Sequence, residues 1–276
     1  MRNEELDRAV TEEPLEIRLH GRPFAVVMRT PGNDRELAAG FLLSERVILG
    51  ADDLGAIEFC ADAGRASVES TSVAPRRLED TAPDSNRGAA NVVNVTLVDR
   101  SRFERAFAER RHVTATASCG VCGRLTIESL AVDVKPLANS WSVPAALLFE
   151  LPDRLRAAQA IFAATGGLHA AGLFDRDGTL ADFAEDVGRH NAVDKVVGRM
   201  LMRDALPLAN HVLCVSGRTS FEIVQKAAIA GIPLVAAVSA PSSLAIDLAR
   251  SFGLTLVGFV REKSFNIYAQ AGRIVT

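Results

Sequence analysis

The chain has 276 residues, of which 48% are hydrophobic and 24% charged, and its formal net charge is −3. This length and composition suit one large globular domain or two smaller ones, and they exclude a disordered chain. The slightly acidic balance, without a long basic run, argues against nucleic acid as a partner, because binding to a phosphate backbone calls for a basic surface.

The first residues are charged, with Arg2, Glu4 and Glu5, and they lack the apolar stretch of a signal peptide. No apolar run reaches the roughly 18 residues that a membrane-spanning helix needs. We therefore expect a cytoplasmic protein without a membrane partner.

The N-terminal part predicts a small α+β region. Residues 15–20 and 24–29 read as two strands around a Gly-Arg-Pro turn, and the loop 30–34 leads into a helix whose apolar residues recur at helical spacing. Residues 92–98 are the clearest further strand, and 103–111 predict a short helix.

The middle of the chain predicts a longer helix over residues 144–164, with a break at Pro152. An apolar segment over 168–174 follows and ends in a turn at 175–178.

Strands and helices alternate in the last third of the chain. Strands are predicted over 211–215, 234–238 and 255–260, with helices over 219–230 and 243–252. Short strands that alternate with helices of about ten residues indicate βαβ units on a parallel sheet. The sequence therefore predicts an α/β fold, with an N-terminal α+β region over residues 1–135 that ends with a CxxC loop, and a C-terminal α/β domain over 136–276.

The CxxC motif, Cys119-Gly120-Val121-Cys122, lies in a stretch of small residues. Its thiols can react with each other or share a metal ion, and Arg124 favours the thiolate. Zinc binding and redox or sulfur chemistry both suit such a motif. A structural zinc site is disfavoured, because no second CxxC follows and the next candidate ligand is the distant His169. Of the other cysteines, Cys214 is expected in the core and Cys60 to be structural or incidental.

Residues 185–195 concentrate polar side chains at a predicted helix start. On a helix that begins near Gly188, His190 and Asp194 lie four residues apart, as do Asn191 and Lys195. One interpretation is a solvated helix with salt links. The other is a functional site, with His190 as an acid–base group or cofactor contact. His169 is expected to be a packed or hydrogen-bonded histidine.

Each predicted parallel strand is followed by a polar loop, at residues 216–220, 239–243 and 260–264. These loops would lie along one edge of the sheet, where α/β proteins bind ligands. In the first loop, backbone N–H groups at a helix start and the charge of Arg218 suit a phosphate or diphosphate group. Thr219 and Glu222 have capping-box spacing. Ordinary caps and turns are the alternative, because none of these loops is a known nucleotide motif.

Several long motifs resemble those of one known family. They are an N-terminal signature (residues 11–15, 28–32 and 37–42), the cysteine loop (118–123), and central and C-terminal motifs (165–171, 185–195 and 216–220). By these motifs the chain resembles the formate dehydrogenase accessory sulfurtransferases, the FdhD/NarQ family, over about residues 11–270.

The resemblance implies a sulfurtransferase, a sulfur carrier required for formate dehydrogenase activity. Such a carrier takes sulfur from a cysteine desulfurase of the IscS type and holds it as a cysteine persulfide. It then passes the sulfur to the molybdenum cofactor, bis(molybdopterin guanine dinucleotide) with molybdenum or tungsten, before the cofactor enters the catalytic subunit of formate dehydrogenase. By this resemblance Cys119 carries the persulfide, Cys122 is its partner, and the protein holds no permanent metal of its own.

The resemblance further implies a cytidine-deaminase-like three-layer fold for the C-terminal domain, and a homodimer. It places the cofactor against Phe259, Val260, Arg261, Glu262, Lys263 and Ser264. The loop after the first parallel strand adds Ser216, Gly217, Arg218 and Thr219 to the predicted cofactor contacts, and the helix start adds His190 and Asn191. The run Glu262-Lys263-Ser264 departs from the Gly- or Arg-rich turn expected there.

Two other functions match parts of the sequence. A zinc deaminase needs His-x-Glu followed by Pro-Cys-x-x-Cys, whereas two alanines follow His169 and the CxxC motif precedes it. A non-catalytic chaperone that holds the cofactor for the apo-dehydrogenase matches the predicted sheet edge equally well. The carrier and the chaperone differ in whether Cys119 is needed.

Overall fold

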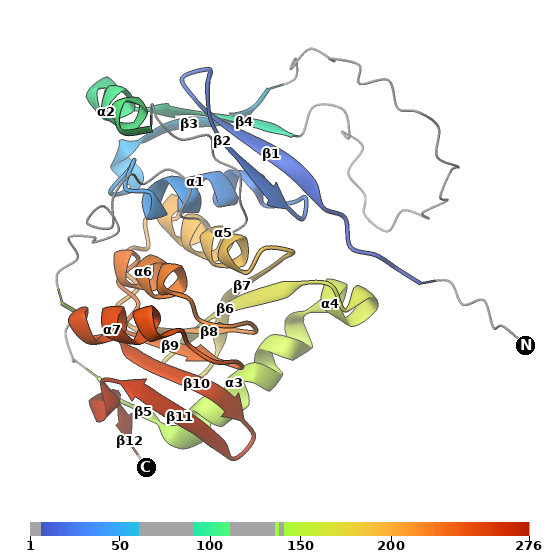
Figure 1. The fold of residues 1–276 in the computed structure, drawn as a ribbon, viewed down its shortest axis with the longest axis vertical. Coiled ribbons are helices and arrows are strands. Elements are labelled where there is room, and N and C mark those ends of the chain that lie inside the picture. The colour runs from blue at the N-terminus through green and yellow to red at the C-terminus, as the bar shows by residue number, and fades with distance from the viewer. Residues whose placement is uncertain (1–6, 61–90, 111–135, 138–140, 276) are drawn as a thin grey trace, which may run out of the picture.

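The computed structural model describes residues 7–60, 91–110, 136–137 and 141–275. Within these ranges a four-stranded N-terminal sheet stacks over a six-stranded sheet, with helices between them (Figure 1). The N-terminal sheet has the strand order β2-β1-β4-β3. The elements of this part are β1 (Glu13–Leu19), β2 (Arg22–Arg29), α1 (Asp34–Ser44), β3 (Leu54–Phe59), β4 (Val92–Leu97) and α2 (Arg100–Arg110).

The six-stranded sheet has the order β11-β10-β9-β8-β6-β7, and its three parallel strands β8, β9 and β10 confirm the predicted βαβ units. Its strands are β6 (His169–Asp175), β7 (Leu180–Asp186), β8 (His211–Val215), β9 (Leu234–Ala237), β10 (Thr255–Arg261) and β11 (Ser264–Ala269). The helices are α3 (Ala145–Ala158), α4 (Ala160–Thr165), α5 (Arg189–Met202), α6 (Phe221–Ile229) and α7 (Ser243–Ser251). The short strands β5 (Val143–Pro144) and β12 (Ile274–Val275) pair with each other.

The six-stranded sheet is the middle of three layers. Successive side chains of a strand point to opposite faces, so Leu213 and Val215 join the core under α5, α6 and α7, whereas Val212 and Cys214 join the core against α3. Figure 1 shows α5, α6 and α7 on one face of this sheet and α3 on the other. The α/β fold class is therefore confirmed, and these layers are compatible with the expected three-layer domain.

Helices α1 and α5 join the N-terminal sheet to the rest of the molecule. A Cβ atom added at Gly40 would lie 2.0 Å from the carbonyl oxygen of Asp194, and one at Gly198 would lie 1.9 Å from that of Glu36. The two helices therefore cross with their backbones almost in contact. One hydrophobic core cluster runs through this crossing into the N-terminal sheet. The predicted boundary between residues 135 and 136 stays a prediction.

Helix α3 corrects one expectation, because it continues through Pro152 and ends at Ala158, with Gln159 as its C-cap residue. A proline inside a helix removes one backbone hydrogen bond. Here Leu148, Leu151 and Leu155 are all buried on one face of α3, and their packing holds the helix together across that position.

Candidate functional site

The strand directions bring five chain segments to one end of the six-stranded sheet. Strands β8, β9 and β10 end there, β7 ends there at Asp186, and β6 starts there, since His169 pairs with Asp186. We call this end the carboxyl edge, and it comprises His169 and residues 186–191, 216–220, 239–242 and 259–264. It contains every predicted cofactor residue.

The loops of the carboxyl edge are fastened to one another by backbone hydrogen bonds. Thr219 N donates to Ala240 O at 3.1 Å, and Ser242 N donates to Thr219 O at 3.0 Å, so the loops after β8 and β9 run as a pair. The hydroxyl of Ser216 accepts a hydrogen bond from Ala170 N at 2.9 Å. The prediction that the loops after the parallel strands share one edge is therefore confirmed.

Cationic groups gather around Gly217. A Cβ atom there would lie 3.2 Å from His169 Nδ1 and 3.7 Å from Arg189 Cδ, so these side chains flank the glycine, while Arg218 next to it is exposed. Burial lowers the pKa of His169, and the charges of Arg189, His190 and Arg218 lower it further. The imidazole of His169 is thus held neutral beside two permanent positive charges, which suits an anionic ligand.

His190 is bound within the edge. Its Nε2 lies 2.7 Å from Glu222 Oε2 and 3.0 Å from Ser220 Oγ, which ties the start of α5 to the start of α6. The predicted capping box is wrong, because the N-cap residue of α6 is Ser220, not Thr219. Glu222 instead directs its carboxylate to His190, which gives one oxygen of this buried group a hydrogen-bond partner.

The interpretation of residues 185–195 as a solvated helix is also wrong. Asp194 and Lys195 are each 2% exposed, and Asp186 is fully buried. Asp194 accepts hydrogen bonds from Lys226 Nζ at 2.7 and 2.8 Å, and Lys195 Nζ lies 2.7 Å from Asp186 Oδ2. The expected salt links therefore exist, but inside the protein.

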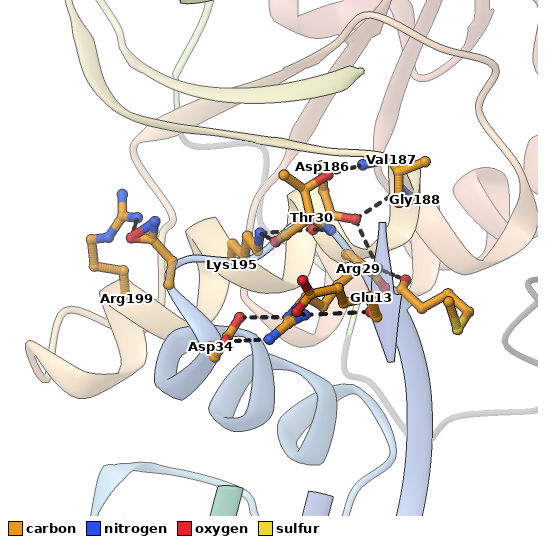
Figure 2. A network of polar contacts seen from close by, with 12 residues as sticks. Glu13, Arg29, Thr30, Asp34, Asp186, Val187, Gly188, Lys195 and Arg199 are labelled. Atoms are coloured by element: carbon orange, nitrogen blue, oxygen red, sulfur yellow. Dashed lines mark hydrogen bonds and ion pairs between the residues drawn. The ribbon is translucent and has the colours of Figure 1, made fainter. Parts of the chain in front are cut away.

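Asp186 is the centre of a polar network that reaches the N-terminal part (Figure 2). Its Oδ1 accepts hydrogen bonds from Gly188 N at 2.8 Å and Asn191 Nδ2 at 2.9 Å. The Asn191 amide also donates to Met28 O at 2.7 Å. The side-chain NH2 group of Asn191 therefore donates within the protein, to Asp186 and to Met28. Its side-chain carbonyl oxygen remains available for a cofactor contact.

Residues 259–264 surround the hairpin between β10 and β11. Phe259 adopts a left-handed backbone with φ 54° and is 41% exposed. Val260 is buried in the core against α3, so only its backbone is available to a ligand. Arg261 Nη1 donates to Val238 O at 2.6 Å, which fastens the hairpin to the loop after β9. Glu262 and Lys263 are exposed in the turn, and Ser264 begins β11.

Three buried polar atoms at the start of α5 and α6 have no hydrogen-bond partner among the described residues. They are Arg189 Nε, Thr219 Oγ1 and Glu222 Oε1. Buried polar atoms in native proteins are normally hydrogen-bonded to protein, water or ligand. A polar ligand or ordered water would therefore complete this edge. Arg189 Nε and Thr219 Oγ1 can donate to a phosphate group, whereas the carboxylate oxygen of Glu222 accepts a hydrogen bond and needs a donor.

The cysteine pair Cys119 and Cys122 lies outside the described residues. Cys214 is fully buried, and burial raises the pKa of its thiol to about 12, which confirms its expected place in the core. Cys60 is partly exposed. Within the described ranges, no group of three or more histidine, cysteine, aspartate or glutamate residues could hold a metal ion.

Sequence reasoning missed several residues of the edge. The sequence patterns do not single out Arg189, they predict Glu222 as part of a helix cap, and they do not predict the partners of Asp186. The signal for Arg189 was present, since it directly precedes His190 at a predicted helix start, where anions bind.

The fold and the carboxyl edge define a mixed α/β protein whose loops gather where its parallel strands end, the place where α/β proteins bind their ligands. Comparison with known proteins gives the particular family. The model of the FdhD/NarQ family matches residues 10–275, and the chain belongs to this family. The resemblance drawn from the sequence motifs is confirmed.

The relatives agree with this assignment. The chain is 51% identical to the "Sulfur carrier protein FdhD" of Streptomyces coelicolor, over 97% of this chain and 89% of that protein. It is 49% identical to the protein of the same name from Mycolicibacterium paratuberculosis, over 96% and 91%. A crystal structure of a formate dehydrogenase accessory protein from Desulfotalea psychrophila is similar, with a TM-score of 0.70 and 26% identity over 98% of this chain and 91% of that one. None of the helices in the described ranges has the length and apolar character to cross a membrane.

Proposed function

We propose that this protein is a sulfur carrier that serves formate dehydrogenase and acts as a sulfurtransferase through a persulfide on Cys119. The sulfur would come from a cysteine desulfurase of the IscS type. The acceptor would be the molybdenum cofactor, bis(molybdopterin guanine dinucleotide) with molybdenum or tungsten, before its insertion into the catalytic subunit of formate dehydrogenase. The family assignment and the names of the relatives support this role.

The observation that carries the proposal is the carboxyl edge. Arg189, Arg218 and the neutral His169 lie together at the ends of parallel strands, with unpartnered buried polar atoms beside them. A dinucleotide cofactor brings several phosphate charges, and such groups bind at helix starts next to arginine. The cofactor is cargo in this scheme, and the edge holds it while the sulfur is delivered.

The chemistry of the carrier is a pair of thiol exchanges. The Cys119 thiolate attacks the terminal sulfur of the desulfurase persulfide, the donor S–S bond breaks, and the desulfurase cysteine leaves as a thiolate. The Cys122 thiolate then attacks the inner sulfur of the Cys119 persulfide. A disulfide forms between the two cysteines, and the terminal sulfur leaves as hydrosulfide. The hydrosulfide would replace an oxygen ligand of the metal, and that oxygen would leave as hydroxide. A dithiol reductant of the cell restores both thiols.

Substitution of Cys119, with the buried Cys214 as the control position, tests the proposal in cells that lack their own carrier. Cys119→Ala should abolish formate dehydrogenase activation, and Cys214→Ala should leave it unchanged. Mass spectrometry after incubation with desulfurase and cysteine should show one added sulfur atom on Cys119. Full activation by the Cys119→Ala protein would rule out the carrier and favour a chaperone that only holds the cofactor.

The remaining expectations are part of the same proposal. Persulfide chemistry requires reduced thiols, which suits a cytoplasmic location. A homodimer would present two carboxyl edges, and sedimentation analysis would measure this state directly.

A further inference from the structure

The turn between β7 and α5 is held by a residue from the opposite part of the molecule, Thr30. This turn, Val187-Gly188, leads directly into Arg189 and His190 of the carboxyl edge. Gly188 is the N-cap residue of α5 and supplies no side-chain cap of its own. The orientation of the turn must therefore come from other groups.

Thr30 orients the turn through two hydrogen bonds, one to Asp186 and one from Val187. Its backbone N–H donates to Asp186 Oδ2 at 3.2 Å, and its hydroxyl oxygen accepts from Val187 N at 3.1 Å. Its carbonyl oxygen accepts from Lys195 Nζ at 2.8 Å. Figure 2 shows Thr30, which directly follows β2, beside its three partners Asp186, Val187 and Lys195. Thr30 is 6% exposed, so water does not compete freely for them.

The hydroxyl of Thr30 acts on the edge through Val187, and its backbone N–H acts through Asp186. One oxygen of this carboxylate binds Thr30 and Lys195, and the other binds Gly188 N and the Asn191 amide. A shift of Thr30 therefore shifts the N–H groups at the start of α5, together with Arg189. We propose that Thr30 is a positioning residue for the carboxyl edge, and that its hydroxyl sets the orientation of the β7–α5 turn for ligand binding.

The expected effect of Thr30 on ligand binding rests on the proposed function. The expected effect of Thr30 on the orientation of the turn does not depend on that function. Thr30→Val removes the hydroxyl at almost constant volume, and Thr30→Ser retains it. Thr255→Val is the matched control, because Thr255 is also a buried, hydrogen-bonded threonine but lies at the opposite end of β10. Thr30→Ala gives the same comparison if the valine variant does not fold.

Two measurements on the full chain decide the matter. Amide hydrogen exchange of a peptide covering residues 186–191 should become about tenfold faster in Thr30→Val and stay within about twofold of the wild type in Thr30→Ser and Thr255→Val. Binding of guanosine diphosphate, a probe for the nucleotide end of the cofactor, should weaken about fivefold in Thr30→Val and be restored by serine.

The outcomes separate the inference from the proposed function. Unchanged exchange in Thr30→Val, or equal acceleration in Thr255→Val, would overturn the role of Thr30. Wild-type protein that binds no guanosine diphosphate would count against the proposed nucleotide site, while the exchange result would still decide whether Thr30 positions the turn.

Discussion

The crossing of α1 and α5 allows a prediction in which two effects oppose each other. Gly198→Ala should stabilise α5 by about 0.8–1 kcal/mol, because alanine is the better helix former. The added Cβ, however, would lie 1.9 Å from Glu36 O and 2.7 Å from Gly40 N. Both atoms belong to the backbone of α1 and cannot rotate away, so the helices must separate by about 1 Å or more.

The cost of that separation exceeds the gain. Overpacking costs about 1–3 kcal/mol, and a gap of about 0.5–1 Å forfeits a quarter to a half of the dispersion energy of each contact that it opens. The buried side chains of Leu37, Val193 and Val197 belong to the core cluster that spans this crossing. We therefore expect a net loss of about 3 kcal/mol in the free energy of unfolding.

Thermal and urea unfolding measure this loss. In a chain of this size, Tm should fall by roughly 6–12 °C. Gly50→Ala is the control, because no atom lies within 4 Å of a Cβ at that position and its backbone is extended. The control should stay within about 0.5 kcal/mol of the wild type. A Gly198→Ala protein as stable as the wild type would refute the close crossing.

Three further predictions concern charges and thiols. Lys226→Met leaves Asp194, whose pKa is raised by burial, without its cation. Urea unfolding at pH 8 should therefore show a free energy of unfolding about 3–5 kcal/mol lower than that of the wild type. The loss should be smaller at pH 5, because a carboxyl with a raised folded-state pKa favours folding below its unfolded pKa and loses that contribution as the pH rises through the folded value. Native protein treated with iodoacetamide at pH 8 should remain unlabelled at Cys214, because burial raises the pKa of that thiol to about 12, and labelling as fast as in urea would contradict its burial. Arg218→Ala should weaken guanosine diphosphate binding about tenfold, whereas Arg250→Ala, on the exposed side of α7, should not change it.

The last third of the chain could be predicted well because its strands are buried on both faces. Strand β8 has the predicted bounds, and β9, β10 and α7 differ from theirs by one residue. Such strands read as continuous apolar runs, which the sequence displays directly. Strands β7 and β11 were missed for the opposite reason. Both lie at the outer sides of the sheet, where residues such as Asp182 and Asn266 interrupt the apolar pattern.

The candidate site could be predicted in its position but not in its contacts. The order of strands and loops predicts that residues 216–220 and 260–264 lie at one edge, because parallel strands must end together. The partners of His190 and Asp194 could not be read from helical spacing, which relates residues on one element only. Glu222, Lys226 and Ser44 lie 30 or more residues away along the chain, and only the packing of α1, α5 and α6 brings them near.

The same packing explains why so many charged groups of α5 are buried. A buried charge is tolerated only where partners of opposite charge and further hydrogen bonds surround it. Asp194 has Lys226 from α6 and the Ser44 hydroxyl from α1, and Lys195 has Asp186 from β7 and the carbonyl oxygen of Thr30. Each charge therefore has one partner in the C-terminal part of the chain and one in the N-terminal part. Without the N-terminal part, both charges would lose one of their partners, so we expect the start of α5, and with it the carboxyl edge, to depend on the contacts of that part.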